Sequence, residues 1–176
     1  HGASAATGVR TESPADLAAG RAPSVAAVID TVILSGPGRQ LVAQAVLQQS
    51  RGTVFRIVTF RRAGRPVSPF VAYAESRGVP CDVIEETGRL DMSVLPSVRE
   101  AFARAGATVV QTHGYRPSAI MRSLRALGWY GGGWVGFYHG ATAEDWKVRL
   151  YDALDRRLLR SADQVVVMSR PQLALF

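Results

Sequence analysis

The last third of the chain constrains the fold most strongly, because it contains a complete strand–turn–helix–strand unit. An apolar run at 134–138 is followed by His139 and Gly140, then by a helical pattern over about 143–161, and then by a second apolar run at 164–168. α/β proteins place ligand sites in polar turns that follow buried strands. The turn at His139 is therefore the first candidate site.

The preceding residues repeat this alternation of strand and helix. Continuous apolar runs are typical of buried parallel strands, and helical spacing separates them. The alternation predicts a Rossmann-like α/β domain with three layers and a mostly parallel sheet. Four earlier strands are predicted at 25–30, 53–60, 82–85 and 107–112, and further helices at 38–50, 69–77, 91–105, 117–127 and from 169 onward. Pro96 allows the third of these helices to start near 95 instead.

Length and composition indicate one folded domain, at 24–176, in a chain of 176 residues. Residues 1–23 are small and polar, without periodicity or a signal-peptide pattern, so we expect a flexible N-terminal segment or the remnant of a tag. The chain ends soon after its last predicted strand. We therefore expect it to be the front part of a longer protein.

The net charge of +7 comes almost entirely from arginine, with Lys147 as the single lysine. A GC-rich genome is one explanation, and attraction to phosphate-bearing ligands or an anionic membrane is the other. The arginines are scattered rather than interleaved with aromatic residues, so no nucleic-acid partner is expected. The single Cys81 excludes an internal disulfide and a multi-cysteine metal site.

Localisation is predicted from the absence of a long apolar run. No stretch approaches the roughly 20 residues that span a bilayer, so a cytoplasmic protein is expected. The loop containing Arg61, Arg62 and Arg65 either touches the inner membrane face, as a peripheral contact, or is simply solvated.

Three polar turns follow predicted strands, at 35–39, 113–116 and 139–145. Because carboxyl ends of parallel strands meet at one edge of a sheet, we expect the three turns to line one crevice. Gly36, Pro37 and Gly38 predict a tight turn, where backbone N–H groups and Arg39 would hold a phosphate. A plain strand-to-helix connection is the alternative.

Two other residue patterns bear on ligands at this edge. Leu41 stands where the dinucleotide fingerprint G-x-G-x-x-G requires glycine, which argues against an NAD-type dehydrogenase. His113 and His139 each follow a buried strand and precede a glycine, which indicates a general base or a donor to a bound hydroxyl. A histidine bonded to neighbouring backbone is the alternative for each.

The helix after His139 is predicted to begin at the N-cap Thr142, with Asp145 completing a capping box. Asp152 and Arg156 at i,i+4 spacing, with Arg157 and Arg160, are predicted to form a solvated face rather than a binding site. Lys147 either points to the crevice or belongs to that solvated face. Four apolar residues at helical spacing are predicted to pack on the core: Trp146, Leu150, Leu154 and Leu158.

The motif H-G-A-T-A-E-D-W-K-V-R-L-Y-D-A-L-D-R-R-L-L-R-S-A-D-Q-V-V-V-M-S resembles the N-terminal domain of family 4 glycosyltransferases, the retaining GT-B group. A His-Gly follows the fifth strand, a tyrosine precedes D-R-x-L-L-R-x-A-D, and the next strand ends in serine. V-V-Q-T-H-G-Y and V-I-D-T-V-I-L-S-G-P-G-R-Q-L are similar to earlier strand ends of that family. The resemblance covers about 25–176.

The resemblance implies two Rossmann-like domains that face a cleft, of which this chain is the acceptor-side half. The missing C-terminal domain would bind the sugar nucleotide, a co-substrate, and neither a metal nor another cofactor is needed. By this resemblance, Gly36, Pro37 and Gly38 would border the donor phosphates and the acceptor, and His139 would position the transferring sugar at the catalytic centre. An acceptor would meet His113, Tyr115 and Arg116. From the residues alone, we add Arg39 to the phosphate contact and Lys147 to the acceptor contact.

Two functions follow from these observations. The first is the acceptor-side domain of a sugar-nucleotide-dependent retaining glycosyltransferase, inactive alone, whose acceptor is a hydroxylated lipid, glycan or small molecule. The second is a stand-alone Rossmann-like module that binds a phosphorylated ligand or a partner protein.

Overall fold

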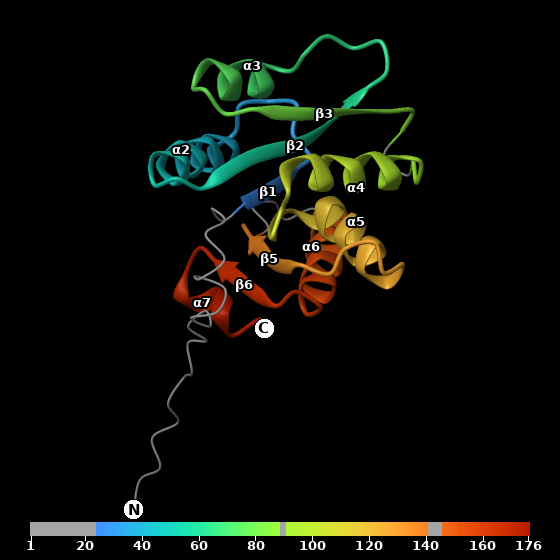
Figure 1. The fold of residues 1–176 in the computed structure, drawn as a ribbon. Helices are drawn as coiled ribbons and strands as arrows, with labels where there is room; N and C mark the ends of the chain where they lie inside the picture. The colour runs from blue at the N-terminus through green and yellow to red at the C-terminus, as the bar shows by residue number, and fades with distance from the viewer. Residues whose placement is uncertain (1–23, 89–90, 141–145) are drawn as a thin grey trace, which may run out of the picture.

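The structure is a computed structural model that describes residues 24–88, 91–140 and 146–176, with backbone alone for 146–148. A six-stranded sheet with the order β3-β2-β1-β4-β5-β6 forms its centre, and every strand pair in it is parallel (Figure 1). The strands are β1 (Ser24–Ile29), β2 (Val54–Arg62), β3 (Cys81–Glu86), β4 (Val109–His113), β5 (Gly133–Tyr138) and β6 (Gln164–Val167). The predicted Rossmann-like parallel α/β fold is confirmed.

Helices connect the strands in the predicted order. They are α2 (Gly36–Ser50), α3 (Pro69–Ser76), α4 (Val94–Ala105), α5 (Tyr115–Ala126), α6 (Trp146–Leu159) and α7 (Arg170–Leu173). The alternative start of α4 near 95 is confirmed, since Pro96 lies in its first turn, where its missing N–H costs no helical hydrogen bond. Among the described helices, none is long and apolar enough to cross a membrane.

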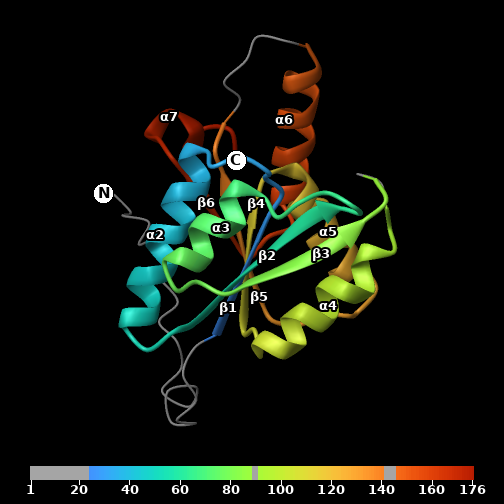
Figure 2. The ribbon, with the colours of Figure 1, turned by 90° about the horizontal axis from the view of Figure 1, so that it is seen from above.

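Two helical layers cover the sheet, as Figure 2 shows from above. α2 and α3 pack on one face, and α4, α5 and α6 pack on the other. The alternation of side chains along β1 explains why both faces are apolar. Ala27 and Ile29 point towards α2 and α3, whereas Ala26 and Val28 point towards α4 and α5.

The strand order reverses between β1 and β4, which makes the carboxyl ends of these strands a topological switch point. Crevices at such points are where open α/β sheets bind ligands. Ile29 at the end of β1 lies beside His113 at the end of β4, and His113 lies beside Phe137 of β5. The fold therefore brings the predicted histidine turns to one edge of the sheet.

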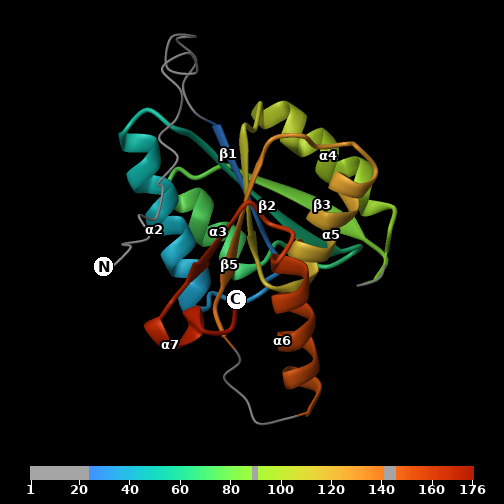
Figure 3. The same cartoon turned by 90° about the horizontal axis from the view of Figure 1, so that it is seen from below.

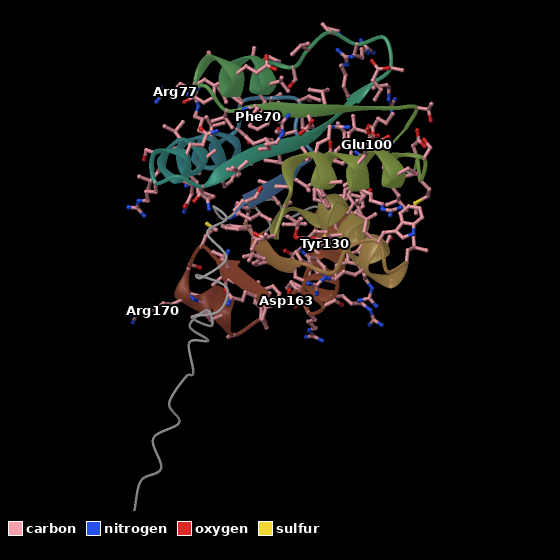
Figure 4. The ribbon with its side chains drawn as sticks, in the orientation of Figure 1. Phe70, Arg77, Glu100, Tyr130, Asp163 and Arg170 are labelled. Atoms are coloured by element: carbon pink, nitrogen blue, oxygen red, sulfur yellow. The ribbon has the colours of Figure 1, made fainter. Side chains whose placement is uncertain are left out.

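The start of α2 differs from the predicted turn at Gly36, Pro37 and Gly38. These residues form the first turn of the helix itself, and Ser35 is the N-cap whose Oγ accepts from the N–H of Gly38. Proline is compatible with a first helical turn, which is the reason the helix begins earlier than predicted. Glycine at 38 leaves room for Phe70 of α3, since a Cβ there would lie 3.1 Å from the ring (Phe70 is labelled in Figure 4).

The predicted core face of α6 is wrong. Leu150 is 58% exposed and Leu154 is 41% exposed, whereas Asp155 and Leu159 are buried. Figure 3 shows the first turns of α6 projecting beyond the sheet while its last turns lie against α5. The helix therefore packs with a different face from the one that its leucine spacing indicates. The predicted cap at Thr142 and Asp145 and the predicted flexible segment 1–23 lie outside the described residues.

Asp163 links the amino end of β5 to helix α5. Figure 4 labels this residue, which lies directly before β6. Its carboxylate accepts from the backbone N–H of Trp134 at 2.7 Å and from the Arg125 guanidinium of α5. Carboxylates that accept charge-assisted hydrogen bonds hold neighbouring segments firmly. This contact fixes the amino end of β5, so that its carboxyl end is positioned for the site.

Candidate functional site

The two predicted site histidines lie in direct contact. Nδ1 of His113 is 3.1 Å from Nε2 of His139, and the two rings stack with centroids 5.4 Å apart. The ring of Phe137 stacks on His113, with ring centroids 4.6 Å apart. Each histidine precedes a glycine with positive φ, +93° at Gly114 and +78° at Gly140. This conformation favours glycine and turns the chain away from the strand end.

Burial keeps both imidazoles neutral. It lowers the pKa of His113 to about 3, with a smaller contribution from His139 beside it, and it also lowers the pKa of His139. Two neutral rings in contact share one hydrogen, so one nitrogen donates and the other accepts. The direction of this hydrogen bond thus decides whether the other ring nitrogen of His139, Nδ1, is a hydrogen-bond donor or an acceptor for a ligand.

A cavity of about 170 Å³ opens beside His139 at the carboxyl ends of β4 and β5. The rings of Tyr115 and Tyr151 stack in parallel at its wall, with centroids 4.7 Å apart. An aromatic wall with convergent polar groups is typical of small-molecule sites. The lining residues are Gly114, Tyr115, Tyr138, His139, Gly140, Tyr151, Asp152 and Asp155.

The two carboxylates of this cavity have different environments. Asp152 accepts a hydrogen bond of 2.5 Å from the hydroxyl of Tyr138 and pairs with Arg156, the predicted i,i+4 contact. Asp155 is only 7% exposed, and burial raises its pKa to about 6, with a further upward contribution from Asp152. Two nearby carboxyls with separated pKa values are suited to different roles.

A buried chain of hydrogen-bonding side chains ends at Asp155. The indole N–H of Trp134 can only donate, and it donates to Thr112 Oγ1 at 2.9 Å. Thr112 Oγ1 lies 3.4 Å from Ser118 Oγ. The single hydroxyl hydrogen of Ser118 is shared between Asp155 Oδ1, at 3.1 Å, and the backbone carbonyl of Gly114, at 2.9 Å. Hydrogen bonds to the ionised form oppose the effect of burial on the pKa of Asp155.

Tyr138 reaches the cavity as a neutral donor. Burial raises its pKa to about 12, and its hydrogen bond to Asp152 acts in the same direction. Its ring is buried against the core while its hydroxyl meets Asp152. Asp152 is thereby held in place, with its remaining lone pairs available to a ligand.

Arg116 lies next to Tyr115 but points into a buried ion-pair network. Its guanidinium contacts the carboxylates of Asp30, at 3.2 Å, and of Glu86, and it lies 4.4 Å above the ring of Phe60. These partners come from the ends of β1, β2 and β3. The network ties the first turn of α5 to these strand ends; contact with an acceptor stays a prediction for Arg116.

The predicted phosphate contact at the start of α2 has few free donors. Pro37 has no N–H, and the N–H of Gly38 is occupied by Ser35. The guanidinium of Arg39 lies 5.5 Å above the ring of Tyr73 in α3. The contact therefore stays a prediction, as does that of Lys147, whose side chain lies outside the described residues.

Apart from two glycines of the histidine turns, four cavity residues are absent from the predicted site: Tyr138, Tyr151, Asp152 and Asp155. The sequence contained a signal for two of them, because Tyr151, Asp155 and Leu159 recur at i, i+4 and i+8. That stripe was obscured by the stronger leucine stripe beside it. In the part of the chain that the structure describes, no group of three His, Cys, Asp or Glu side chains is placed to hold a metal ion.

Comparison with known proteins identifies the family. Residues 35–176 match the glycosyl transferase 4-like domain, which is most of the chain. The chain belongs to this family. The resemblance to the N-terminal domain of family 4 glycosyltransferases is therefore confirmed. A comparison with curated protein sequences gives no match.

Solved glycosyltransferase structures share the fold of this family member. HepE from Anabaena, in complex with UDP, has a TM-score of 0.66 at 12% identity over 86% of this chain and 39% of its own. Sucrose-phosphate synthase from Thermosynechococcus elongatus has a TM-score of 0.57 at 18% sequence identity, over 88% of this chain and 44% of the synthase. MurG from Acinetobacter baumannii has a TM-score of 0.56 at 14% sequence identity, over 82% of this chain and 41% of MurG. The chain spans about two fifths of the length of each of these GT-B enzymes.

Proposed function

We propose that this domain is the acceptor side of a sugar-nucleotide-dependent retaining glycosyltransferase and is inactive without a donor-binding domain. The observation that carries the proposal is the cavity at the carboxyl ends of β4 and β5, where stacked tyrosines, two carboxylates and His139 of the histidine pair converge. Such sites accelerate transfer by orienting the reactants and stabilising charge.

The cavity groups suit a hydroxylated ligand. The stacked rings of Tyr115 and Tyr151 give the cavity an apolar wall, on which the C–H groups of a sugar-like ring can pack. Asp152 and Asp155 supply acceptors for hydroxyl hydrogens. His139 is the member of the histidine pair that lines the cavity, and in this proposal it positions the transferring sugar and stabilises charge on it.

The donor class follows by analogy with a structural neighbour. The Anabaena HepE structures contain UDP, and one contains UDP and glucose. We therefore take a UDP-sugar as the donor to test first. The start of α2, with Arg39, borders its phosphates in this proposal, while a second domain holds the nucleotide.

Ligand titration followed by NMR of the 176-residue chain tests the proposal. Methyl glucoside, a simple hydroxylated ring, is expected to shift the ring resonances of Tyr115 and Tyr151, and Tyr151→Ala is expected to weaken its binding about tenfold. Tyr73→Ala, in α3 on the other face of the sheet, is the matched control. Tight binding of UDP-glucose to this chain alone, without a response from the tyrosines, contradicts the acceptor-side assignment.

The alternative, a stand-alone module for a phosphorylated ligand or a partner protein, has a separate test. The reading frame beyond Phe176 either stops or continues into a second domain of similar size. By the family resemblance, that second domain would bind the sugar nucleotide with a pair of glutamates. A continuing frame supports the transferase, and a stop codon supports the stand-alone module.

One surface of the domain supports the proposal of a peripheral contact with the inner membrane face. A cavity of about 400 Å³ is lined by Val32, Val67, Arg61, Arg62 and Arg65, among others. Val32 is 62% exposed, and apolar residues beside arginines suit an anionic lipid surface. Arg61 pairs with Glu85, which leaves Arg62 and Arg65 as the better residues to change.

Sedimentation with vesicles measures this contact. The wild type is expected to bind vesicles containing phosphatidylglycerol, and Arg62→Ala with Arg65→Ala to lose most of that binding, at about 1 kcal/mol per arginine. Arg157→Ala with Arg160→Ala, at the end of α6, controls for net charge. Equal loss in both double variants indicates charge alone and rejects a specific membrane face.

A further inference from the structure

The contact between His113 and His139 leaves two possible hydrogen positions. Either Nδ1 of His113 donates to Nε2 of His139, or Nε2 of His139 donates to Nδ1 of His113. The two arrangements give His139 opposite characters at its other nitrogen, Nδ1, which is a donor in the first and an acceptor in the second. Among the described residues, Nδ1 of His139 has no hydrogen-bond partner, and His139 lines the cavity.

The far side of His113 distinguishes the two arrangements. His113 is only 7% exposed, and its Nε2 is buried without a hydrogen-bond partner among the described residues. The second arrangement places a hydrogen on this Nε2, which leaves a buried N–H unsatisfied. Orphaned buried N–H groups are rare because their desolvation is not compensated.

We infer that His113 is a positioning residue that donates from Nδ1 to Nε2 of His139 and thereby holds His139 as the Nδ1–H tautomer. The site consequently presents a hydrogen-bond donor at His139 rather than a base. Such a donor recognises an oxygen that carries lone pairs or negative charge, such as a sugar hydroxyl oxygen or a phosphate oxygen. The use of this donor for a ligand rests on the proposed function, but the tautomer itself does not.

The surrounding protein, and not the intrinsic preference of the imidazole ring, places the hydrogen on Nδ1 of both histidines. A free histidine in water prefers hydrogen on Nε2, so both rings adopt their less favoured tautomer here. Phe137 stacks on His113 and the register with Ile29 fixes the strand beneath it, so the ring is held where only Nδ1 meets a partner. Burial lowers the pKa of both histidines, so at neutral pH each ring is uncharged and carries a single N–H hydrogen.

NMR of the ¹⁵N-labelled 176-residue chain at pH 7.5 tests the inference, with correlations from the ring C–H groups to both ring nitrogens. His139 is expected to show a pyrrole-type shift at Nδ1 and a pyridine-type shift at Nε2. The chain has three histidines, and variants at 113 and 139 assign the signals. A pyridine-type shift at Nδ1 and a pyrrole-type shift at Nε2 of His139 in the wild type overturn the inference. This measurement needs no variant, so the inference stays testable even if a variant fails to fold.

Two substitutions separate positioning from packing. His113→Asn retains an N–H donor near Nδ1, so His139 is expected to keep hydrogen on Nδ1. His113→Leu fills similar space without a donor, so His139 is expected to return to the Nε2–H form. If methyl glucoside binds the wild type, His113→Leu is expected to weaken it about tenfold and His113→Asn less than threefold. An unchanged His139 tautomer in His113→Leu overturns the inference, whereas a lack of glucoside binding alone counts against the proposed function.

Discussion

At the scale of single residues, environment rather than residue type sets the chemistry of this site. His113 and Asp155 are both ordinary titratable residues, but burial lowers the pKa of the first to about 3 and raises that of the second to about 6. Both shifts favour the neutral form. At pH 7 burial thus leaves a neutral histidine beside carboxylates that can accept hydrogen bonds from the hydroxyls of a ligand.

Asp155→Asn is expected to stabilise the protein at pH 7. The folded pKa of Asp155 lies above its unfolded value, so its stabilising contribution is complete below about pH 3.9 and is lost as the pH rises through about 6. Urea denaturation is expected to show the variant more stable by on the order of 2 kcal/mol at pH 7, with the difference vanishing near pH 4. His113 acts in the opposite direction in both proteins and cancels in the comparison. A pH-independent difference would contradict the burial of an ionised Asp155.

Gly136→Ala is expected to destabilise the fold by about 1–3 kcal/mol, the range for overpacking a core. A Cβ at 136 would lie 2.1 Å from Cδ2 of Leu159, which is fully buried. Gly131→Ala is the matched control, since a Cβ there meets nothing within 4 Å. Thermal unfolding of both variants measures the difference, and equal melting temperatures would show that Leu159 relaxes freely.

At the scale of elements, α6 shows how a helix can present a face that its leucines do not indicate. Tyr151, Asp152 and Asp155 line the cavity, whereas Leu150 stays exposed. The helix contacts α5 and β5 through its last turns, where Leu159 enters the core. The projecting first turns leave the polar stripe free to form one wall of the site.

Leu159→Ala is expected to cost about 2–5 kcal/mol of unfolding free energy, because it leaves a cavity in the core. Leu150→Ala, the same substitution on the exposed face of α6, is expected to change stability by less than about 0.5 kcal/mol. Denaturation in urea compares the two. A larger loss for Leu150→Ala would mean that the leucine stripe, and not the stripe of Asp155, packs on the sheet.

At the scale of the whole domain, Arg116 connects the two halves of the sheet across the switch point. The guanidinium comes from α5, which follows β4, while Asp30 and Glu86 come from the ends of β1 and β3. Breaking a buried ion pair from one side leaves the remaining charges uncompensated. The carboxyl edge that carries the site therefore depends on this network for its shape.

Arg116→Met is expected to destabilise the domain by about 3–5 kcal/mol, the range for removing one partner of a buried pair. Arg122→Met, on the exposed side of the same helix, is expected to have little effect. Adding Glu86→Gln to Arg116→Met is expected to recover part of the loss. Equal stabilities of the two single variants, in urea titrations at pH 7, would show that the network contributes nothing.

The sequence by itself determined the layers, the strands and the family. Continuous apolar runs separated by helical spacing leave few alternatives to a parallel α/β sheet, and His113 and His139 could be placed at strand ends because each run stops there. The leucines of α6 were misassigned for a physical reason. Helical spacing shows which residues share a face, but not which face has a partner when several contain apolar residues.

Only the tertiary structure decided which of these residues meet. The strand order puts β4 between β1 and β5, so that His113 contacts His139 across 26 positions of the chain and Arg116 reaches carboxylates from two other strands. Burial then sets pKa values, and burial depends on every neighbour at once. Local patterns in the chain do not encode such long-range contacts. Asp152 was therefore predicted to lie on a solvated face, and Asp155 was given no role, although both line the cavity.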